Sequence, residues 1–197
     1  MKDRTSFNRL LYLWLKIDIM RKLKNIELNR LSIDQYRTSE KIPLIVILDN
    51  VRSLNNIGSV FRTCDGFGIG RLILCGISTP PPHRDIYKTA LGAEEAVDWE
   101  YFAETMDAVR KIKDEGYYIA AVEQVENSML LDKFIPPAKM PLALVFGHEI
   151  KGVQQEIVDV CDACIEIPQY GTKHSFNISV SAGIVLWEIS RKMAAFR

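Results

Sequence analysis

Residues 44–62 decide the fold, and they read Leu44-Ile-Val-Ile-Leu-Asp-Asn-Val-Arg-Ser-Leu-Asn-Asn-Ile-Gly-Ser-Val-Phe-Arg62. The first five form a continuous apolar, β-branched run, which is typical of a strand buried on both faces of a sheet. We expect a polar loop over 49–57 and a helix over 58–67. A strand, a loop and a helix in this order make up the first half of a βαβ unit.

The same alternation continues along the chain. Further apolar strands are expected at 71–75, 117–122, 142–146 and 164–167, and helices at 104–115, 153–160 and 178–195. This rhythm predicts an α/β fold with a mostly parallel sheet and helices on both faces. Ligands of such sheets bind beyond the carboxyl ends of the strands.

Composition and charge predict one domain preceded by an arm. The chain has 197 residues, of which 48% are hydrophobic and 25% charged, and these ordinary values argue against disorder and against a disulfide scaffold. Residues 1–41 carry a net charge of +5 and residues 42–197 a net charge of −5. We expect a basic helical N-terminal arm over 1–42 that contacts phosphates, with a solvated helix face as the alternative, and a domain over 43–197.

The N-terminal segment predicts neither secretion nor a membrane span. The apolar run at 10–15 has six residues and is followed at once by Lys16 and Asp18, so it is too short for a signal peptide. No segment reaches the roughly 18 apolar residues that a membrane helix needs. The cytoplasm is the expected location. Met20 opens a fresh basic segment and is an alternative start site.

Three expected strands end at polar, glycine-containing loops. The first loop leads through Asn56 to Arg62, and free helix N–H groups beside a guanidinium suit an oxyanion; capping with a surface Arg62 is the alternative. The second reads Gly147-His-Glu-Ile-Lys-Gly152. Its Gly147 permits close approach of a ligand and its Glu149 accepts hydrogen bonds, and a plain strand-to-helix turn is the alternative.

The third loop reads Ile167-Pro-Gln-Tyr-Gly-Thr-Lys-His-Ser-Phe-Asn-Ile-Ser179. Ser175 has the chemistry of a helix cap. The many polar backbone groups of such a loop suit the edge of a flat heteroaromatic ring, which an ordinary cap does not explain.

Other motifs are set aside. Cys161-x-x-Cys164 lacks further ligands nearby in sequence, so no metal site is expected. Gly66-Phe-Gly-Ile-Gly70 has the wrong spacing for a dinucleotide fingerprint, and no P-loop or H-E-x-x-H motif occurs. Surface or capping roles are expected for His83 and His174.

Together the three loops resemble the three motifs of the SPOUT superfamily, in its TrmH-type branch of RNA ribose 2′-O-methyltransferases. The pattern N-x-G-x-x-x-R-T matches residues 56–63, G-x-E-x-x-G matches 147–152, and I-P-x-x-G-x-x-x-S-[LF]-N-[VI]-S matches 167–179. The resemblance covers roughly residues 43–195 and implies a C-terminal deep trefoil knot, an exception to the rule that chains are unknotted.

The resemblance also implies a cofactor, partners and site residues. It implies S-adenosylmethionine bound in the knot, a homodimer with the site completed across the interface, and methyl transfer to a ribose 2′-OH of tRNA or rRNA. The implied cofactor contacts are Glu123, Gln124, Gly147, Ile167, Gln169, Gly171, Ser175 and Phe176. Gln169 stands where an apolar residue such as Met is usual in the family.

The residues that the resemblance implies for the reaction are Asn56, Arg62, Glu149, Ser175 and Asn177. The resemblance implies the proton-accepting role that is often assigned to the arginine at the position of Arg62, but a guanidinium stays protonated above pH 12. We favour a clamp on the target phosphate and 2′-oxygen, oriented by Glu149 and Asn56. Two alternatives stay open: a non-catalytic knotted RNA-binding module, and a SPOUT enzyme that methylates a base nitrogen.

Overall fold

The computed structural model of the chain describes residues 21–138 and 140–194. The chain divides between Ser32 and Ile33 into two compact units, and each is described by itself. In the first unit, residues 21–32 are exposed and contain a 3₁₀-helix at Asn25–Leu28. The Arg21 guanidinium donates two hydrogen bonds, of 2.6 and 3.0 Å, to the Glu27 carboxylate. Residues 1–20 of the helical arm expected over 1–42 lie outside the described residues.

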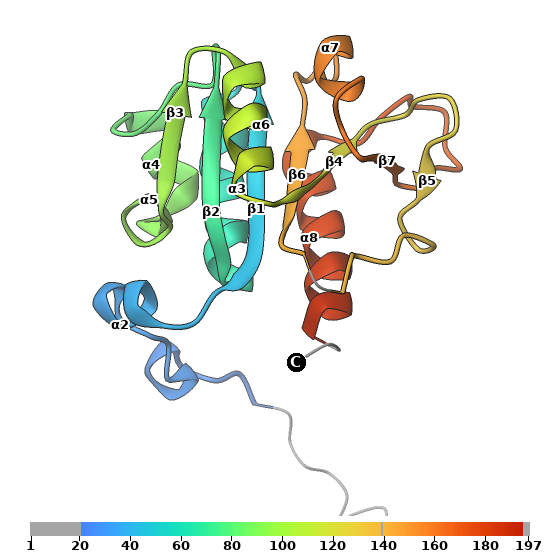
Figure 1. The fold of residues 1–197 in the computed structure, drawn as a ribbon. Coiled ribbons are helices and arrows are strands. Elements are labelled where there is room, and N and C mark those ends of the chain that lie inside the picture. The colour runs from blue at the N-terminus through green and yellow to red at the C-terminus, as the bar shows by residue number, and fades with distance from the viewer. Residues whose placement is uncertain (1–20, 139, 195–197) are drawn as a thin grey trace, which may run out of the picture. The chain divides into compact units, whose positions relative to one another are not determined.

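The second unit is an α/β domain (Figure 1). Its described residues form seven strands, which are β1 (Ile42–Asp49), β2 (Ile69–Cys75), β3 (Trp99–Phe102), β4 (Tyr118–Val122), β5 (Met129–Leu130), β6 (Leu142–Phe146) and β7 (Ala163–Glu166). The helices are α2 (Ile33–Thr38), α3 (Leu54–Phe67), α4 (Arg84–Ala90), α5 (Ala93–Ala96), α6 (Thr105–Asp114), α7 (Gln155–Val158) and α8 (Ile178–Ala194).

The sheet has the strand order β3-β2-β1-β6-β4-β7-β5, and every neighbouring pair is parallel. The expected α/β fold with a parallel sheet is therefore confirmed. From β1 the chain continues to β2 on one side, and from β6 it continues to β7 on the other side. The loops after β1 and β6 diverge, and such a switch point leaves a crevice at the carboxyl ends of the strands.

Helices cover both faces of the sheet because the strand residues alternate between two apolar clusters. Leu44, Val46 and Leu48 of β1 pack in a cluster with residues of α3, α4, α5 and α8. Ile45 and Ile47 pack in a second cluster with residues of α6 and α7. These five side chains are 0–1% exposed, which explains why β1 reads as an unbroken apolar run.

The structure differs from the sequence expectations at several boundaries. Helix α3 begins at Leu54, four residues earlier than expected, because the Ser53 hydroxyl caps it by accepting from the Asn56 N–H. The expected helix at 153–160 is only the four-residue α7. The sequence reading missed β3, β5, α4 and α5. Strand β3 lies at the sheet edge with alternating exposure, so it lacks the buried apolar run used as the criterion.

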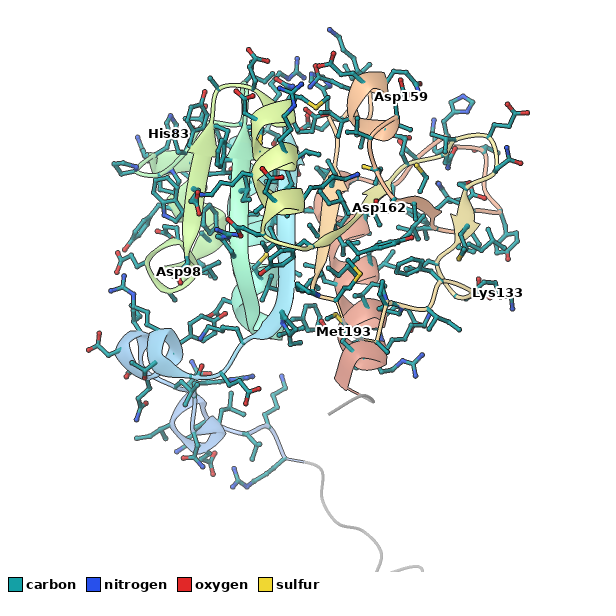
Figure 2. All side chains as sticks on the ribbon, in the orientation of Figure 1. His83, Asp98, Lys133, Asp159, Asp162 and Met193 are labelled. Carbon is teal, nitrogen blue, oxygen red and sulfur yellow. The ribbon has the colours of Figure 1, made fainter. Side chains whose placement is uncertain are left out.

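Surface side chains mark the two ends of the sheet in Figure 2. His83 lies beside α4 at one side of the domain, and Lys133 lies after β5 at the opposite side. The His83 ring caps α4 by accepting from the Asp85 N–H at 3.1 Å, which confirms the expected capping role. Among the described residues, no helix is both long and apolar enough to cross a membrane.

Candidate functional site

The three motif loops follow β1, β6 and β7, and they meet at the carboxyl ends of these parallel strands, with β4 lying between β6 and β7. Leu48 of β1 pairs with Phe146 of β6, which in turn pairs with Val122 of β4. The next residues along each strand are Asp49, Gly147 and Glu123. Parallel strands in this register bring the loops that follow them to one edge of the sheet, where β1 and β6 form the switch point.

Glu149 joins the second loop to the first. Its carboxylate accepts hydrogen bonds from the Arg52 N–H (3.1 Å), the Ser53 N–H (2.9 Å) and the Asn56 Nδ2 (3.0 Å). Partial burial alone would raise the pKa of Glu149, but the hydrogen bonds from its own backbone, from Arg52 and Ser53, and from Asn56 lower the pKa below its usual value. The side chain is therefore an ionised acceptor at neutral pH.

Asn177 joins the third loop to the same group. Its Nδ2 donates to Asn56 Oδ1 at 3.2 Å, so Asn56 bridges Glu149 and Asn177. Asn177 also caps α8, since its Oδ1 accepts from the Ser179 N–H at 2.9 Å. The cap is therefore Asn177 and not Ser175, the other candidate at this helix start, because α8 begins at Ile178.

A second carboxylate, that of Asp49 in the first loop, accepts hydrogen bonds from the end of the second loop. Asp49 is fully buried, and it accepts from the Gln154 backbone N–H and from Gln154 Nε2, both at 2.8 Å. It also accepts from Thr105 Oγ1 at 2.6 Å and from Asn50 Nδ2 at 2.9 Å. Glu149 of the second loop holds the first loop, and Asp49 at the start of the first loop holds the end of the second.

A cavity of about 520 Å³ opens beside this network. It has an apolar wall formed by side chains such as Val122, Phe146 and Ile178, and two carboxylates, Glu123 and Glu149. This size falls within the range of about 300 to 1,000 Å³ that is typical of small-molecule sites. The remaining lining residues are Gln124, Gly147, His148, Ile150, Lys151, Gly152, His174, Ser175, Phe176, Asn177 and Ser181.

Most residues that the sequence implied for cofactor binding lie at this cavity. Glu123, Gln124, Gly147, Ser175 and Phe176 line it. A smaller adjoining cavity of about 100 Å³ is lined by Ile167 and Gln169, and it shares residues such as Glu123, Ser175 and Phe176 with the larger one. Gly171 is exposed and lines neither of these two cavities.

The glycines of the second loop serve the chain's own packing. A Cβ on Gly147 would lie 2.1 Å from Gly152 C and Val153 N. Gly152 has a φ of +68°, and its Cβ would lie 2.1 Å from Glu123 Oε2. Glu123 also accepts from the Val153 N–H at 2.9 Å. Gly147 thus lets the loop fold back on itself and also lines the cavity, and its expected contact with a ligand stays a prediction.

Arg62 lies outside the cavity of its own chain. It lines a separate groove between α3, α4 and α8, and the expectation that Glu149 and Asn56 orient it is not met within one chain. The reason is the early start of α3. Because that helix begins at Leu54, Arg62 is two turns into it, about 9 Å beyond Asn56 along the axis and about a third of a turn away.

Some residues of the site were missed from the sequence. His174 lines both cavities, although a surface or capping role was expected for it. His148 Nδ1 accepts from the Ile150 N–H at 3.0 Å and shapes the second loop. Asp49 and Gln154 are 105 positions apart, and nothing local in the sequence signals their contact.

The cysteines do not form part of the site. Cys161 and Cys164 are free thiols that pack against the apolar cluster beneath α6 and α7. Burial, together with the neighbouring Cys164 and Asp162 charges, raises the pKa of Cys161 to about 12. Within residues 21–138 and 140–194, no three His, Cys, Asp or Glu side chains are grouped as a metal would require.

A parallel α/β sheet whose strand-end loops enclose a cavity of cofactor size defines a ligand-binding α/β domain. Comparison with known proteins identifies the family within this class of domains. The chain belongs to the SpoU rRNA Methylase family, whose model matches residues 43–187.

The chain is similar to several named proteins. It is 31% identical over 163 residues to a putative TrmH family tRNA/rRNA methyltransferase of Staphylococcus haemolyticus, covering 81% of this chain and 64% of that protein. It is 28% identical over 170 residues to the 23S rRNA (guanosine-2'-O-)-methyltransferase RlmB of Vibrio parahaemolyticus, covering 86% and 67%. The chain thus spans about three fifths to two thirds of the length of the curated relatives it matches.

Solved structures share the fold. The TrmH/SpoU tRNA modifying enzyme of A. aeolicus superposes with a TM-score of 0.73 at 28% identity, covering 83% of each chain. The AdoMet-bound rRNA methyltransferase of Sinorhizobium meliloti has a TM-score of 0.70 at 28% identity, covering 82% of this chain and 61% of that chain.

Proposed function

We propose that this chain is an S-adenosylmethionine-dependent methyltransferase that acts on a ribose 2′-OH of RNA. The carrying observation is the chain of hydrogen bonds from Glu149 through Asn56 to Asn177, which joins all three motif loops beside one cavity. Family membership and the rRNA and tRNA methyltransferases among the relatives support the same function.

The cavity fits the proposed cofactor. Its apolar wall suits the adenine ring, its exposed backbone groups suit the ring edge, and Glu123 and Glu149 suit a ligand that carries a sulfonium and an ammonium. When bound, S-adenosylmethionine supplies an electrophilic methyl group. Glu123, Gln124, Gly147, Ile167, Gln169, Gly171, Ser175 and Phe176 are the proposed contacts, and the knotted topology of the C-terminal segment belongs to the same proposal.

The protein's own part is to orient the 2′-hydroxyl and to stabilise its developing charge. Glu149 and Asn56 fix the loop between β1 and α3, and Ser175 and Asn177 shape the cofactor loop. Arg62 stays protonated, so we assign it to clamping the target phosphate and the 2′-oxygen. An Arg62→Lys variant with near-normal turnover would contradict this bidentate role.

The position of Arg62 leads us to propose a homodimer in which each cavity receives Arg62 from the partner. The outer face of α8 supports this, since Val180 is 48% and Trp187 61% exposed. Next to them, a cavity of about 510 Å³ is lined by Ile167, Ile184 and Trp187. Exposed apolar area of this kind marks interaction surfaces. A Trp187→Glu variant should sediment as a monomer and lose methyl transfer; an active monomer would contradict the shared site.

One experiment separates the proposed function from its alternatives. The chain is titrated with S-adenosylmethionine by calorimetry, and is then incubated with deuterated cofactor and unmodified tRNA or rRNA before mass spectrometry of the nucleosides. The expected product is a 2′-O-methylated nucleoside, from an RNA of the cytoplasm. Absence of cofactor binding would favour the non-catalytic RNA-binding module, and a methylated base would favour the base-methylating enzyme.

A further inference from the structure

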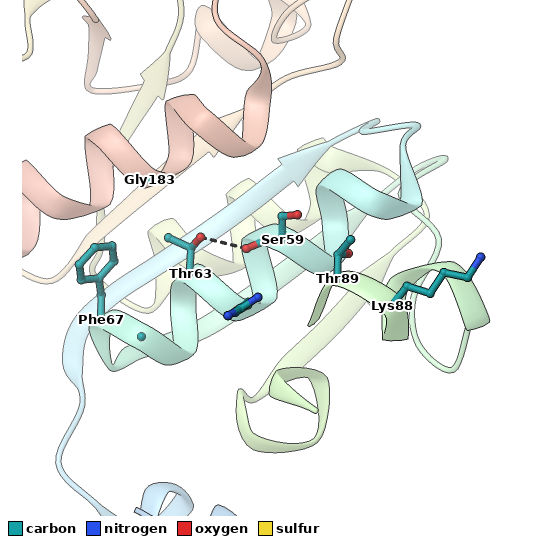
Figure 3. A pocket seen from close by; sticks show the side chains of 8 residues that line it. Ser59, Thr63, Phe67, Lys88, Thr89 and Gly183 are labelled. Atoms are coloured by element: carbon teal, nitrogen blue, oxygen red, sulfur yellow. Dashed lines mark hydrogen bonds between the residues drawn. The ribbon is translucent and has the colours of Figure 1, made fainter. Parts of the chain in front are cut away.

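The groove that contains Arg62 is lined by basic and hydroxyl-bearing side chains. It measures about 620 Å³ and runs between α3, α4 and α8 (Figure 3). Its charged residues are Arg62 and Lys88, and none of its lining residues is acidic. Residues 42–197 carry a net charge of −5, so the groove is a locally positive surface on a domain that is negative overall.

Gly58 brings Lys88 to the groove. A Cβ on Gly58 would lie 2.2 Å from Thr89 Oγ1 and 2.3 Å from Ile86 O, so only glycine lets α4 pack this closely on α3. The Thr89 hydroxyl then donates to Asn55 O at 2.9 Å. This contact fixes the last turn of α4 beside α3 and places Lys88 over the same groove as Arg62.

Both cations are available to a ligand. Among the described residues, Arg62 has no hydrogen bond or ion pair, and its side chain is exposed. Lys88 pairs with Asp85 at 2.6 Å, but the two side chains are 54% and 41% exposed. Exposed ion pairs contribute little to stability, so a phosphate can replace Asp85 as the partner of Lys88 at small cost.

The rest of the groove suits a sugar–phosphate chain. Ser59 and Thr63 line it with hydroxyl groups that donate to Asn55 O and Ser59 O, which leaves their oxygens free to accept from a ribose hydroxyl. Hydroxyls and cations in this combination match the sugar–phosphate contacts of RNA-binding proteins.

We propose that this groove binds the RNA backbone and that Lys88 holds a second phosphate next to the one held by Arg62. The inference rests on the proposed RNA methyltransferase function and deepens it, because it gives the substrate strand a path along α3 and α4. Lys88 is a binding residue for the strand. It lines the groove and does not line the cofactor cavity, so it acts on RNA affinity and leaves cofactor affinity unchanged.

The test measures the salt dependence of RNA binding by Lys88→Gln in the full chain. The control is Lys133→Gln, which removes the same charge from a similarly exposed pair, 3.0 Å from Asp132, on the opposite side of the domain (Figure 2). The probe is a fluorescein-labelled, single-stranded RNA of mixed sequence, long enough to span the groove. Anisotropy gives the Kd over a series of salt concentrations.

Loss of one phosphate contact lowers the slope of log K against log salt by about 0.7 for single strands. Lys88→Gln should show this change and bind about fivefold more weakly at about 0.1 M salt, while Lys133→Gln should match the unsubstituted chain. Equal slopes for the two variants, or unsubstituted binding without salt dependence, would overturn the proposal. A sedimentation coefficient changed by Lys88→Gln with an unchanged slope would do so too, because Lys88 would then contact a second copy of the chain and not RNA.

The two proposals fail in different ways. If the unsubstituted chain transfers methyl groups but Lys88→Gln leaves the salt slope unchanged, the proposed enzyme activity stands and the proposed phosphate site is refuted. If Lys88→Gln lowers the slope but the chain neither binds the cofactor nor transfers methyl groups, the RNA-binding groove stands and the proposed methyltransferase function is refuted. Calorimetry with S-adenosylmethionine, which Lys88→Gln should not alter, provides the independent readout.

Discussion

Replacing Glu149 with Gln tests whether one carboxylate holds the β1–α3 loop. Oε1 accepts from Ser53 N and Asn56 Nδ2, and Oε2 accepts from Arg52 N. A Gln carbonyl can keep the first two partners, but its NH₂ group then faces the Arg52 N–H, so one hydrogen bond is lost and two donors oppose each other. An unmet donor costs about 1–3 kcal/mol when buried, and partial exposure reduces this to about 1–2 kcal/mol.

This loss corresponds to a fall in Tm of about 2–8 °C for a domain of this size. The effect depends on pH with a definite sign. Folding lowers the pKa of Glu149 below 4.5, so its stabilisation is complete above that value and is lost as the pH falls through the folded-state pKa. The difference in Tm between the unsubstituted chain and Glu149→Gln should therefore be full at neutral pH and shrink below pH 4.5.

Thermal unfolding followed by circular dichroism at a series of pH values provides the assay. Glu156→Gln serves as the control, because Glu156 is an exposed α7 residue and its substitution removes the same charge. The control should leave Tm nearly unchanged at neutral pH. A Glu149→Gln Tm equal to that of the control across the pH range would refute the reasoning that Glu149 holds the first loop.

Three further substitutions test other contacts. Gly58→Ala should destabilise the domain by about 1–3 kcal/mol in urea unfolding, because its Cβ would overlap Thr89 Oγ1; an unchanged midpoint would show that α4 moves freely. Asp49→Asn should weaken cofactor binding in calorimetry by about tenfold or more, since an amide cannot accept from both Gln154 donors and Thr105; unaltered affinity would separate Asp49 from the site. Asn177→Ala should cost about 1 kcal/mol through the lost α8 cap, and equal stability would argue against that cap.

The central strands were predictable because both of their faces are buried. β1 and β6 have almost no polar position, so five consecutive apolar residues marked each of them. The edge strand β3 alternates between exposed and half-buried residues, and β5 has only two residues. Tertiary pairing with β2 and β7 creates these two strands, and a local pattern cannot indicate them.

The meeting of the three loops was also predictable, since parallel strands end at one edge. The hydrogen bonds of Glu149, Asn56 and Asn177 confirm it. The direction of Arg62 was not predictable, because it depends on where α3 begins, and an error of four residues in a helix start moves a side chain by more than a full turn. The partners of Asp49 depend on contacts 56 and 105 residues away.

The crossed attachments of Asp49 and Glu149 bear on how a ligand enters. Each of the two loops is hydrogen-bonded to the other, so separating them breaks both sets of bonds at once, and we expect this side of the cavity to stay rigid when a ligand binds. The opposite rim, residues 170–176, is solvent-exposed throughout. Small molecules should therefore enter and leave the cavity by displacement of that rim, while the two hydrogen-bonded loops stay in place.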